Sequence, residues 1–300
     1  MAEFKRGMGP LIAELKKEDL FQNKLKKDIE EGNVFFAIRN GYGSFYVKGS
    51  SLFSYRKNNG FSTHYKFGFI PDGINDDAPY ICESQLDGDD PLRAVKRFCL
   101  GYDRIKRNAE LYAKTEAEGV SALYAFAPRT ANRENRFFLV DIEVAFNSEK
   151  DTENQNEEDK GEKKGSDRID ILLYDNHEKQ LLFCEAKHFS NPEIWAKKGS
   201  NPKVINQLEQ YDRQIVDNKD IIIKEYTTAF SEYNALMGTE LNAPKSVFDK
   251  CGLYIFGFNL EERKELKRIF DVNKNFYGRK CRIIGGSLND SIEKIYTALV

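Results

Sequence analysis

The 300-residue chain holds 22 Phe and 15 Tyr within 40% hydrophobic residues, a composition that can bury a core and excludes a wholly disordered protein. Its 46 basic and 48 acidic residues leave a formal net charge of −2, which argues against a strongly basic nucleic-acid coat protein but not against a local basic groove. No apolar run is long enough to span a membrane, no signal-peptide core is present, and the five scattered cysteines fit reduced thiols, so we expect a cytoplasmic protein without a membrane partner.

The first part of the chain is predicted to form a helix followed by an antiparallel meander. Leucines spaced for one helical face predict a helix over the first 30 residues. Aromatic runs separated by Gly- and Asn-containing breakers predict four strands, over residues 34–39, 44–48, 52–56 and 63–70. The stretch 72–90 has seven acidic residues and no basic one, which indicates a connector. We therefore expect a β-rich N-terminal module over residues 1–88 and a second domain over residues 89–300.

The second domain is predicted to alternate strands with helices, which indicates the α/β class with a mixed (α+β) sheet. A long helix is expected from Pro91 to about Ala117, and residues 148–166, which contain no apolar side chain, predict a mobile acidic loop. The expected strands cover residues 137–146, 169–174, 181–187, 253–258 and 281–284. The later expected helices cover residues 201–217, 221–237, 261–270 and 290–299.

Charged residues on two neighbouring strands are the strongest candidates for chemistry. Asp170 lies on one strand, and Glu185 and Lys187 share one face of the next, because side chains two apart on a strand point the same way. Two carboxylates and an ammonium are costly to bury at the end of an apolar strand pair unless a cation lies among them. Mg²⁺ suits such oxygen ligands, with Mn²⁺ as an alternative, so we expect Asp170 and Glu185, with the Ala186 carbonyl, to hold it. Lys187 would orient or activate the attacking water.

The Glu-x-Lys pattern by itself is a weak signal, because it occurs seven times in the chain. Only the copy at Glu185 follows an apolar strand and has an aspartate on a strand just upstream. The alternative interpretation is a structural ion pair of Glu185 with Lys187 or with Asp170.

Asp170, followed after a hairpin by Glu185-Ala186-Lys187, resembles the signature of the PD-(D/E)xK nuclease superfamily, with Ile169 in place of the proline. The resemblance covers about Phe137 to Ile215. It implies that the domain at 89–300 has a restriction-endonuclease-like core, with the aspartate and the Glu-x-Lys motif on neighbouring central strands of a mixed sheet.

Gln207 and Tyr211 resemble the QxxxY helix motif of the RecB-like members, and they lie one turn apart on one helix face. The resemblance implies that both reach the catalytic cleft, whereas composition alone favours a core tyrosine and a surface glutamine. It also implies an upstream acidic residue as a further metal ligand. Glu143 is the first candidate, with an exposed strand position as its alternative, and Glu110 and Glu116 are further candidates.

A nucleic-acid substrate requires positive charge. We expect it from Arg104 and Arg107 in the basic stretch 93–107, from the basic stretch 261–282, and from three lysines after the Glu-x-Lys strand. Those lysines are Lys197, Lys198 and Lys203. The aromatic residues of the N-terminal module could stack single-stranded bases, but the core of a small β-module is the favoured interpretation.

Together these features predict a Mg²⁺-dependent deoxyribonuclease that hydrolyses phosphodiester bonds with metal-activated water, in DNA restriction, repair or phage defence. DNA is favoured over RNA as partner, and a homo-oligomer or a defence-system partner protein is compatible with the sequence. The alternative is a catalytically inactive nuclease-fold module that binds nucleic acid or a protein partner.

Overall fold

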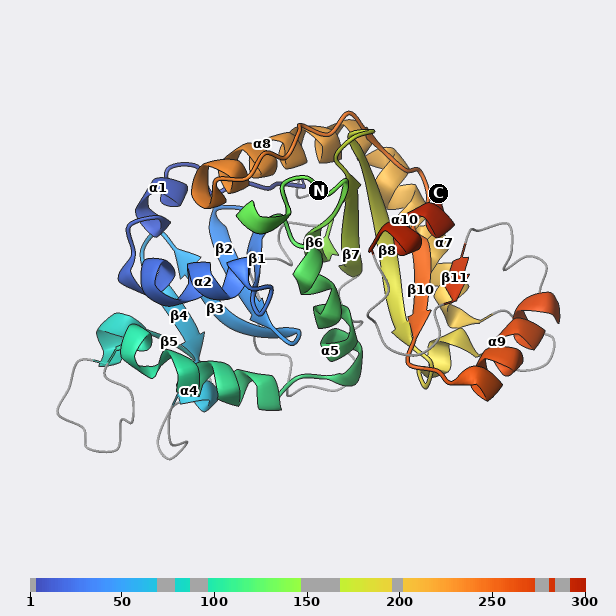
Figure 1. The fold of residues 1–300 in the computed structure, drawn as a ribbon, viewed down its shortest axis with the longest axis horizontal. Coiled ribbons are helices and arrows are strands. Elements are labelled where there is room, and N and C mark those ends of the chain that lie inside the picture. Colours follow the sequence, from blue (N-terminus) through green and yellow to red (C-terminus); the bar gives the residue numbers. More distant parts are fainter. Residues whose placement is uncertain are drawn as a thin grey trace.

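Two β-sheets lie side by side in the computed structural model, with helices packed around both of them (Figure 1). The structure describes residues 4–68, 79–86, 97–146, 168–195, 202–272, 281–283 and 292–300. The mixture of helices with antiparallel and parallel strands confirms the predicted α/β class with a mixed sheet. Among the described helices, none is long and apolar enough to cross a membrane.

The first sheet is an antiparallel meander in the order β1-β2-β3-β4-β5. Its strands are β1 (Phe35–Ile38), β2 (Tyr42–Val47), β3 (Ser50–Arg56), β4 (Gly60–His64) and β5 (Tyr80–Cys82). The strand expected at 63–70 is wrong in its second half, because Tyr65–Gly68 forms the short helix α3. β5 lies inside the stretch that we expected to be a connector, and it pairs with β4 and buries Ile81.

Most aromatic side chains of this sheet are buried, including Phe36, Phe45, Phe53 and Phe61, which confirms that they form a core. The single helix expected at the start of the chain is divided into α1 (Leu11–Leu15), the π-helical turn η1 (Phe21–Leu25) and α2 (Lys26–Glu30). The division lets leucines on both sides of the break, Leu15 and Leu25, become fully buried.

The long helix expected to end near Ala117 is also divided. α4 (Phe98–Leu111) packs on the first sheet, where the rings of Phe98 and Phe53 lie 5.3 Å apart. The chain then turns, and α5 (Thr115–Ser121), extended by η3 (Ala122–Phe126), packs against the second sheet. This division places α5 between the two sheets (Figure 1).

The second sheet has the order β11-β10-β8-β7-β6, with β9 (Ser246–Val247) also paired to β8. β6 (Phe137–Ala145), β7 (Arg168–Asp175) and β8 (Gln180–His188) are antiparallel neighbours, and β10 (Gly252–Phe256) and β11 (Cys281–Ile283) add parallel strands. The later helices are α7 (Lys203–Asp217), α8 (Lys219–Met237), α9 (Leu260–Val272) and α10 (Ile292–Leu299). These bounds lie within a few residues of the predicted ones.

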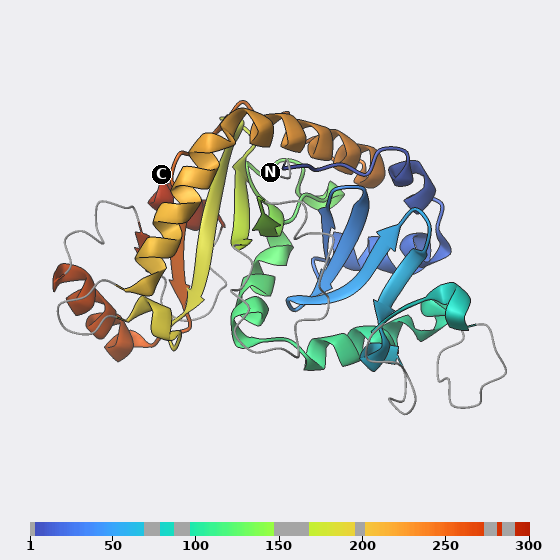
Figure 2. The ribbon, with the colours of Figure 1, turned by 180° about the vertical axis from the view of Figure 1, so that it is seen from behind.

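The helices form layers on both faces of the second sheet. α5 and α10 cover one face, and α7 covers the other, as the two opposite views show (Figures 1 and 2). α8 crosses from α1, beside the first sheet, to β9 in the second (Figure 1). One hydrophobic cluster runs from the N-terminal helices through the first sheet to α7 and α8.

The boundary near residue 88 stays a prediction, and α4, which follows it, packs on the N-terminal sheet. The expected acidic loop at 148–166 lies outside the described residues. Four cysteines, Cys82, Cys99, Cys184 and Cys251, are free thiols.

Candidate active site

β7 and β8 separate in the middle of the second sheet. Their ladder runs from the hairpin turn to the pair Ile171 and Cys184 and ends there. Beyond this point β7 remains paired with β6, while β8 remains paired with β10. Asp170 and Glu185 are the first residues past the split, and the Asp170 carboxylate accepts a hydrogen bond from the Ala186 backbone amide at 2.8 Å. The sheet therefore forks where the sequence places its acidic residues.

Both carboxyl groups at this fork are difficult to ionise. Burial raises the pKa of Asp170 well above its ordinary value, and the Glu185 carboxyl raises it further. Burial also raises the pKa of Glu185 to about 7, although the nearby Lys187 opposes the shift. Only 1% of the Glu185 surface is exposed. One of its oxygens, Oε1, accepts from Lys187, whereas Oε2 is buried and no N–H group among the described residues donates to it. The Asp170 carboxyl group is the other hydrogen-bond partner of Glu185, so the two carboxyl groups contact each other.

The Lys187 ammonium lies between two carboxylates, at 2.9 Å from Glu185 Oε1 and 3.0 Å from Glu193 Oε2. Burial lowers its pKa, but the Glu185 carboxylate outweighs burial and the net pKa is raised. The side chain therefore stays protonated at neutral pH. Charged in this way, it can donate hydrogen bonds to a water or a phosphate oxygen, which fits the orienting role, and its activating role stays a prediction.

These groups fit a hard divalent cation. Two buried carboxyl groups in contact with each other, one with an oxygen to which no N–H group among the described residues donates, favour a proton or a cation between them. Over the described part of the chain, no group of three or more His, Cys, Asp or Glu side chains forms a ready metal site. Mg²⁺ is commonly held by one or two carboxylates together with water and phosphate oxygens, which is the ligand number that Asp170 and Glu185 offer.

Glu143 lies close to Asp170 and raises its pKa. Its backbone has a φ of 52° in the middle of β6, a left-handed conformation that costs about 1–3 kcal/mol in a residue other than glycine. The Glu143 carboxylate lies 3.8 Å from the Arg168 guanidinium. Strain at this strand position, beside the fork, supports the expectation that Glu143 belongs to the site.

Glu116, which the sequence ranked below Glu143, also lies at the fork. Its Oε1 accepts from the His188 backbone amide at 3.0 Å and from Asn191 Nδ2 at 2.6 Å. Glu110 instead pairs with Lys48 of the β2–β3 turn at 3.7 Å. Glu110 lies on α4 and Glu116 on α5, so the break between the two helices separates them. The sequence predicted one continuous helix and therefore did not distinguish the two residues.

A pocket of about 170 Å³ opens beside Asp170. Glu116, Glu143 and Ala186 line it together with Asp170, and Lys114 is its basic lining residue. The sequence did not single out Lys114, because nothing in its local pattern distinguishes it from other surface lysines.

Gln207 and Tyr211 lie behind β7. Tyr211 is fully buried, and its hydroxyl donates to the Arg168 carbonyl at 2.7 Å and accepts from Gln207 Nε2 at 2.9 Å. The pair therefore fixes the end of β7 just before Asp170. This contact gives Tyr211 a positioning role, and Tyr211 also lies near enough to Glu185 and Asp170 for both carboxyl groups to raise its pKa. A direct place for Gln207 and Tyr211 in the cleft stays a prediction.

The expected DNA-binding residues lie on separate parts of the surface. Lys203 is exposed at the first turn of α7, and Arg104 and Arg107 are exposed on α4. Lys197 and Lys198 lie outside the described residues, as do parts of both basic stretches. The structure thus leaves these residues as predictions.

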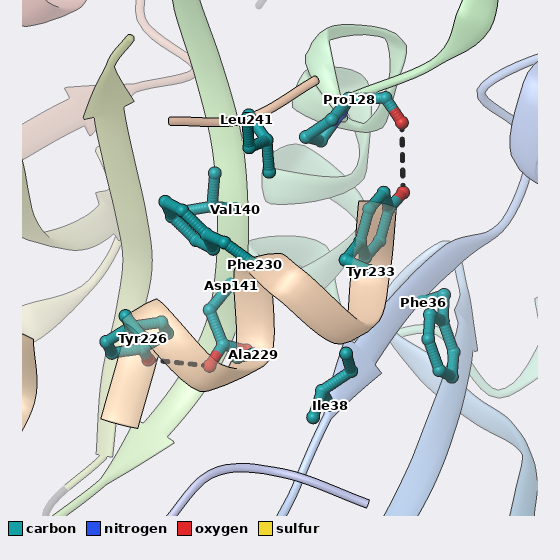
Figure 3. Close-up of a pocket in the computed structure, with 10 residues that line it drawn as sticks. All are labelled: Phe36, Ile38, Pro128, Val140, Asp141, Tyr226, Ala229, Phe230, Tyr233 and Leu241. Atoms are coloured by element: carbon teal, nitrogen blue, oxygen red, sulfur yellow. Dashed lines mark hydrogen bonds between the residues drawn. The ribbon is translucent and has the colours of Figure 1, made fainter. Parts of the chain in front are cut away.

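A second buried carboxylate in the same sheet, Asp141 on β6, has a different environment. Its two oxygens accept from Arg6 at 3.2 Å, Arg39 at 2.6 Å, Tyr226 at 2.7 Å and the Ile142 amide at 2.8 Å. Figure 3 shows Tyr226 of α8 pointing at this carboxylate, beside a hollow of only about 10 Å³. That volume holds about one water, so this cluster is structural.

Comparison of the chain with protein-family models, curated proteins and solved structures gives no match.

Proposed function

We propose that the protein is a Mg²⁺- or Mn²⁺-dependent nuclease that hydrolyses phosphodiester bonds of DNA at the fork between β7 and β8. One observation carries the proposal, namely that two buried carboxyl groups, Asp170 and Glu185, are hydrogen-bonded to each other, while no N–H group within the described residues donates to Glu185 Oε2. A purely structural ion pair of Glu185 with Lys187 would not need a second buried carboxyl group in contact, because two like charges in a buried site are destabilising. The resemblance of Asp170, Glu185 and Lys187 to the nuclease signature supports the same reaction.

Asp170 and Glu185 would hold the cation, and Glu143 and Glu116, which line the pocket beside Asp170, would supply further carboxylates next to it. When bound, the cation lowers the pKa of a water ligand and neutralises charge on the phosphate. Lys187 donates to the attacking water or to a phosphate oxygen, and Glu193 holds the ammonium in place from the other side. Tyr211 keeps β7, and with it Asp170, in register. No covalent nucleophile is needed for in-line attack by water.

Cleavage assays test this proposal. Plasmid DNA, linear DNA and RNA are incubated with the wild-type protein in Mg²⁺, in Mn²⁺ and in EDTA. Lys187→Ala and Asp170→Asn should lower cleavage by about a hundredfold or more. The matched controls Lys219→Ala and Asp249→Asn, which remove an ion pair between partly exposed side chains, should cleave like the wild type.

Two results would contradict the proposal. One is cleavage that persists unchanged in Lys187→Ala and Asp170→Asn, because it would come from another site or a contaminant. The other is tight nucleic-acid binding without turnover in any cation, which would favour the inactive binding module. Faster cleavage of RNA than of DNA would move the substrate to RNA while leaving the reaction in place. A role in restriction, repair or phage defence is part of the proposal and follows from the resemblance.

A further inference from the structure

The N-terminal module reaches the candidate active site through the turn between β2 and β3. Gly49 at this turn has a φ of 83°, and a Cβ added there would overlap the Cβ of Ala117 on α5. The preceding residue, Lys48, pairs with Glu110 of α4 at 3.7 Å. The turn is therefore fixed against both α4 and α5, and Gly49 forms part of the wall of the pocket beside Asp170.

The pocket is lined by both apolar and charged residues. Apolar surface comes from three segments of the chain, namely the β2–β3 turn, the α5–η3 stretch and β6, through Gly49, Ala117, Val120, Tyr124 and Ile142. The same lining includes the carboxyl groups of Glu116, Glu143 and Asp170. A volume of about 170 Å³ can hold one base but cannot admit a double helix.

We propose that this pocket binds one unpaired nucleotide of the substrate, next to the bond that is cleaved. The inference rests on the proposed nuclease function and adds its substrate class, single-stranded or frayed DNA. A base has two apolar faces and a polar edge, and stacking on apolar and aromatic side chains is the usual way to hold it without sequence preference. A base paired in a duplex cannot enter so small a pocket unless it leaves the stack.

The position of the pocket fits the covalent structure of a nucleotide. Asp170 lines the pocket and also lies at the fork where the phosphate would be cleaved. The base attached to that phosphate is then the part of the substrate nearest to the apolar walls. The carboxylates that line the pocket can accept hydrogen bonds from base amino groups, and Lys114 can contact a neighbouring phosphate.

A binding experiment without cations tests the pocket independently of cleavage. Fluorescence anisotropy compares a short labelled deoxycytidine oligonucleotide, whose bases carry an amino group, with a labelled blunt duplex, for the wild type and for Val120→Phe, which fills the pocket. The wild type should prefer the single strand by about tenfold, the size expected for stacking one base. Val120→Phe should lose this preference, and Val216→Phe, the same change on the exposed face of α7, should keep it.

A cleavage experiment on the wild type covers the case in which Val120→Phe does not fold. Single strands that carry one abasic nucleotide at successive positions should be cut about tenfold more slowly when the abasic position falls beside the scissile bond. Equal cleavage at every abasic position, together with equal binding of single strand and duplex, would overturn the inference while leaving the nuclease proposal intact. A preference for the single strand without any cleavage would contradict only the nuclease proposal.

Discussion

Asp141 and Glu185 are both buried carboxylates in the second sheet, with 2% and 1% of their surfaces exposed, but their oxygens have different partners. Asp141 accepts four hydrogen bonds, two of them from arginines. Glu185 accepts from Lys187 at one oxygen, and its other contact is with a second buried carboxyl group, Asp170, instead of an arginine or an N–H group. The hydrogen bonds to Asp141 join Arg6 of the N-terminal segment, Arg39 just after β1 and Tyr226 of α8 to β6. Both Asp141 oxygens are therefore fully used as acceptors.

The difference distinguishes a buried carboxylate that stabilises the fold, Asp141, from one that we propose to be functional, Glu185. A carboxylate whose acceptors are all used contributes to folding and leaves nothing to bind. A buried carboxylate with a free acceptor destabilises the fold until a cation or proton arrives, and this cost is typical of functional sites. Substitutions at the two clusters should therefore have opposite effects on stability and activity.

The largest effect is expected on activity at the fork. Glu185→Gln keeps the shape of the side chain and an acceptor for Lys187 but removes the charge that would hold the cation, so cleavage should fall by about a thousandfold or more. The unfolding midpoint without cations should stay equal to that of the wild type or rise, because a buried charge is lost. Cleavage rates and thermal unfolding of the same preparation measure both. A stable variant with wild-type rates would remove Glu185 from the mechanism.

The largest effect on stability is expected at Asp141. Asp141→Asn leaves the buried Arg6 and Arg39 without their counter-charge, so the free energy of unfolding should fall by about 3–5 kcal/mol in urea denaturation. Asp249→Asn, which removes a partner of the partly exposed Lys219, should cost less than about 1 kcal/mol. If the two losses are similar, the Asp141 cluster does not stabilise the junction between the sheets.

A smaller effect is expected from pH. Glu185 titrates near 4.5 when unfolded and near 7 when folded, so protonation stabilises the folded state. This stabilisation is fully present below pH 4.5 and is lost as the pH rises through 7, which makes the protein in EDTA roughly 2–3 kcal/mol more stable at pH 5 than at pH 8. The raised pKa of Asp170 acts in the same direction.

Urea denaturation across this pH range measures the effect. Glu185→Gln should flatten the profile, and so should saturating Mg²⁺, because a bound cation favours the ionised carboxylate. Glu240→Gln, a change at an exposed side chain, should leave the profile unaltered. A profile that is equally steep in Glu185→Gln would show that other groups produce it.

The smallest effect is expected at the turn between the two regions. Gly49→Ala and Gly41→Ala both place a side chain at positive φ, but only the Cβ at position 49 meets another segment, since nothing lies within 4 Å of that at position 41. Gly49→Ala should therefore be about 1 kcal/mol more destabilising than Gly41→Ala, and it should weaken single-strand preference. Equal losses would mean that the turn does not press on α5.

The sequence predicted those parts of the fold that depend on local pattern. Alternating residues located β6, β7 and β8, and the hairpin between β7 and β8 brought Asp170 to Glu185. The sequence could not predict the fork. β7 separates from β8 because β7 stays paired with β6 while β8 stays paired with β10, and these pairings join distant segments. The contact of Gly49 with Ala117 and the bond from Tyr211 to the Arg168 carbonyl were hidden for the same reason, since each joins distant segments.

Calorimetric titration of Mg²⁺ at pH 8, without nucleic acid, tests the central claim that the fork is a cation site. The wild type and the Asp249→Asn control should bind the ion, and Asp170→Asn and Glu185→Gln should show no measurable binding. Equal binding in all four proteins, or none in the wild type under conditions where it cleaves DNA, would contradict the assignment of Asp170 and Glu185 as metal ligands.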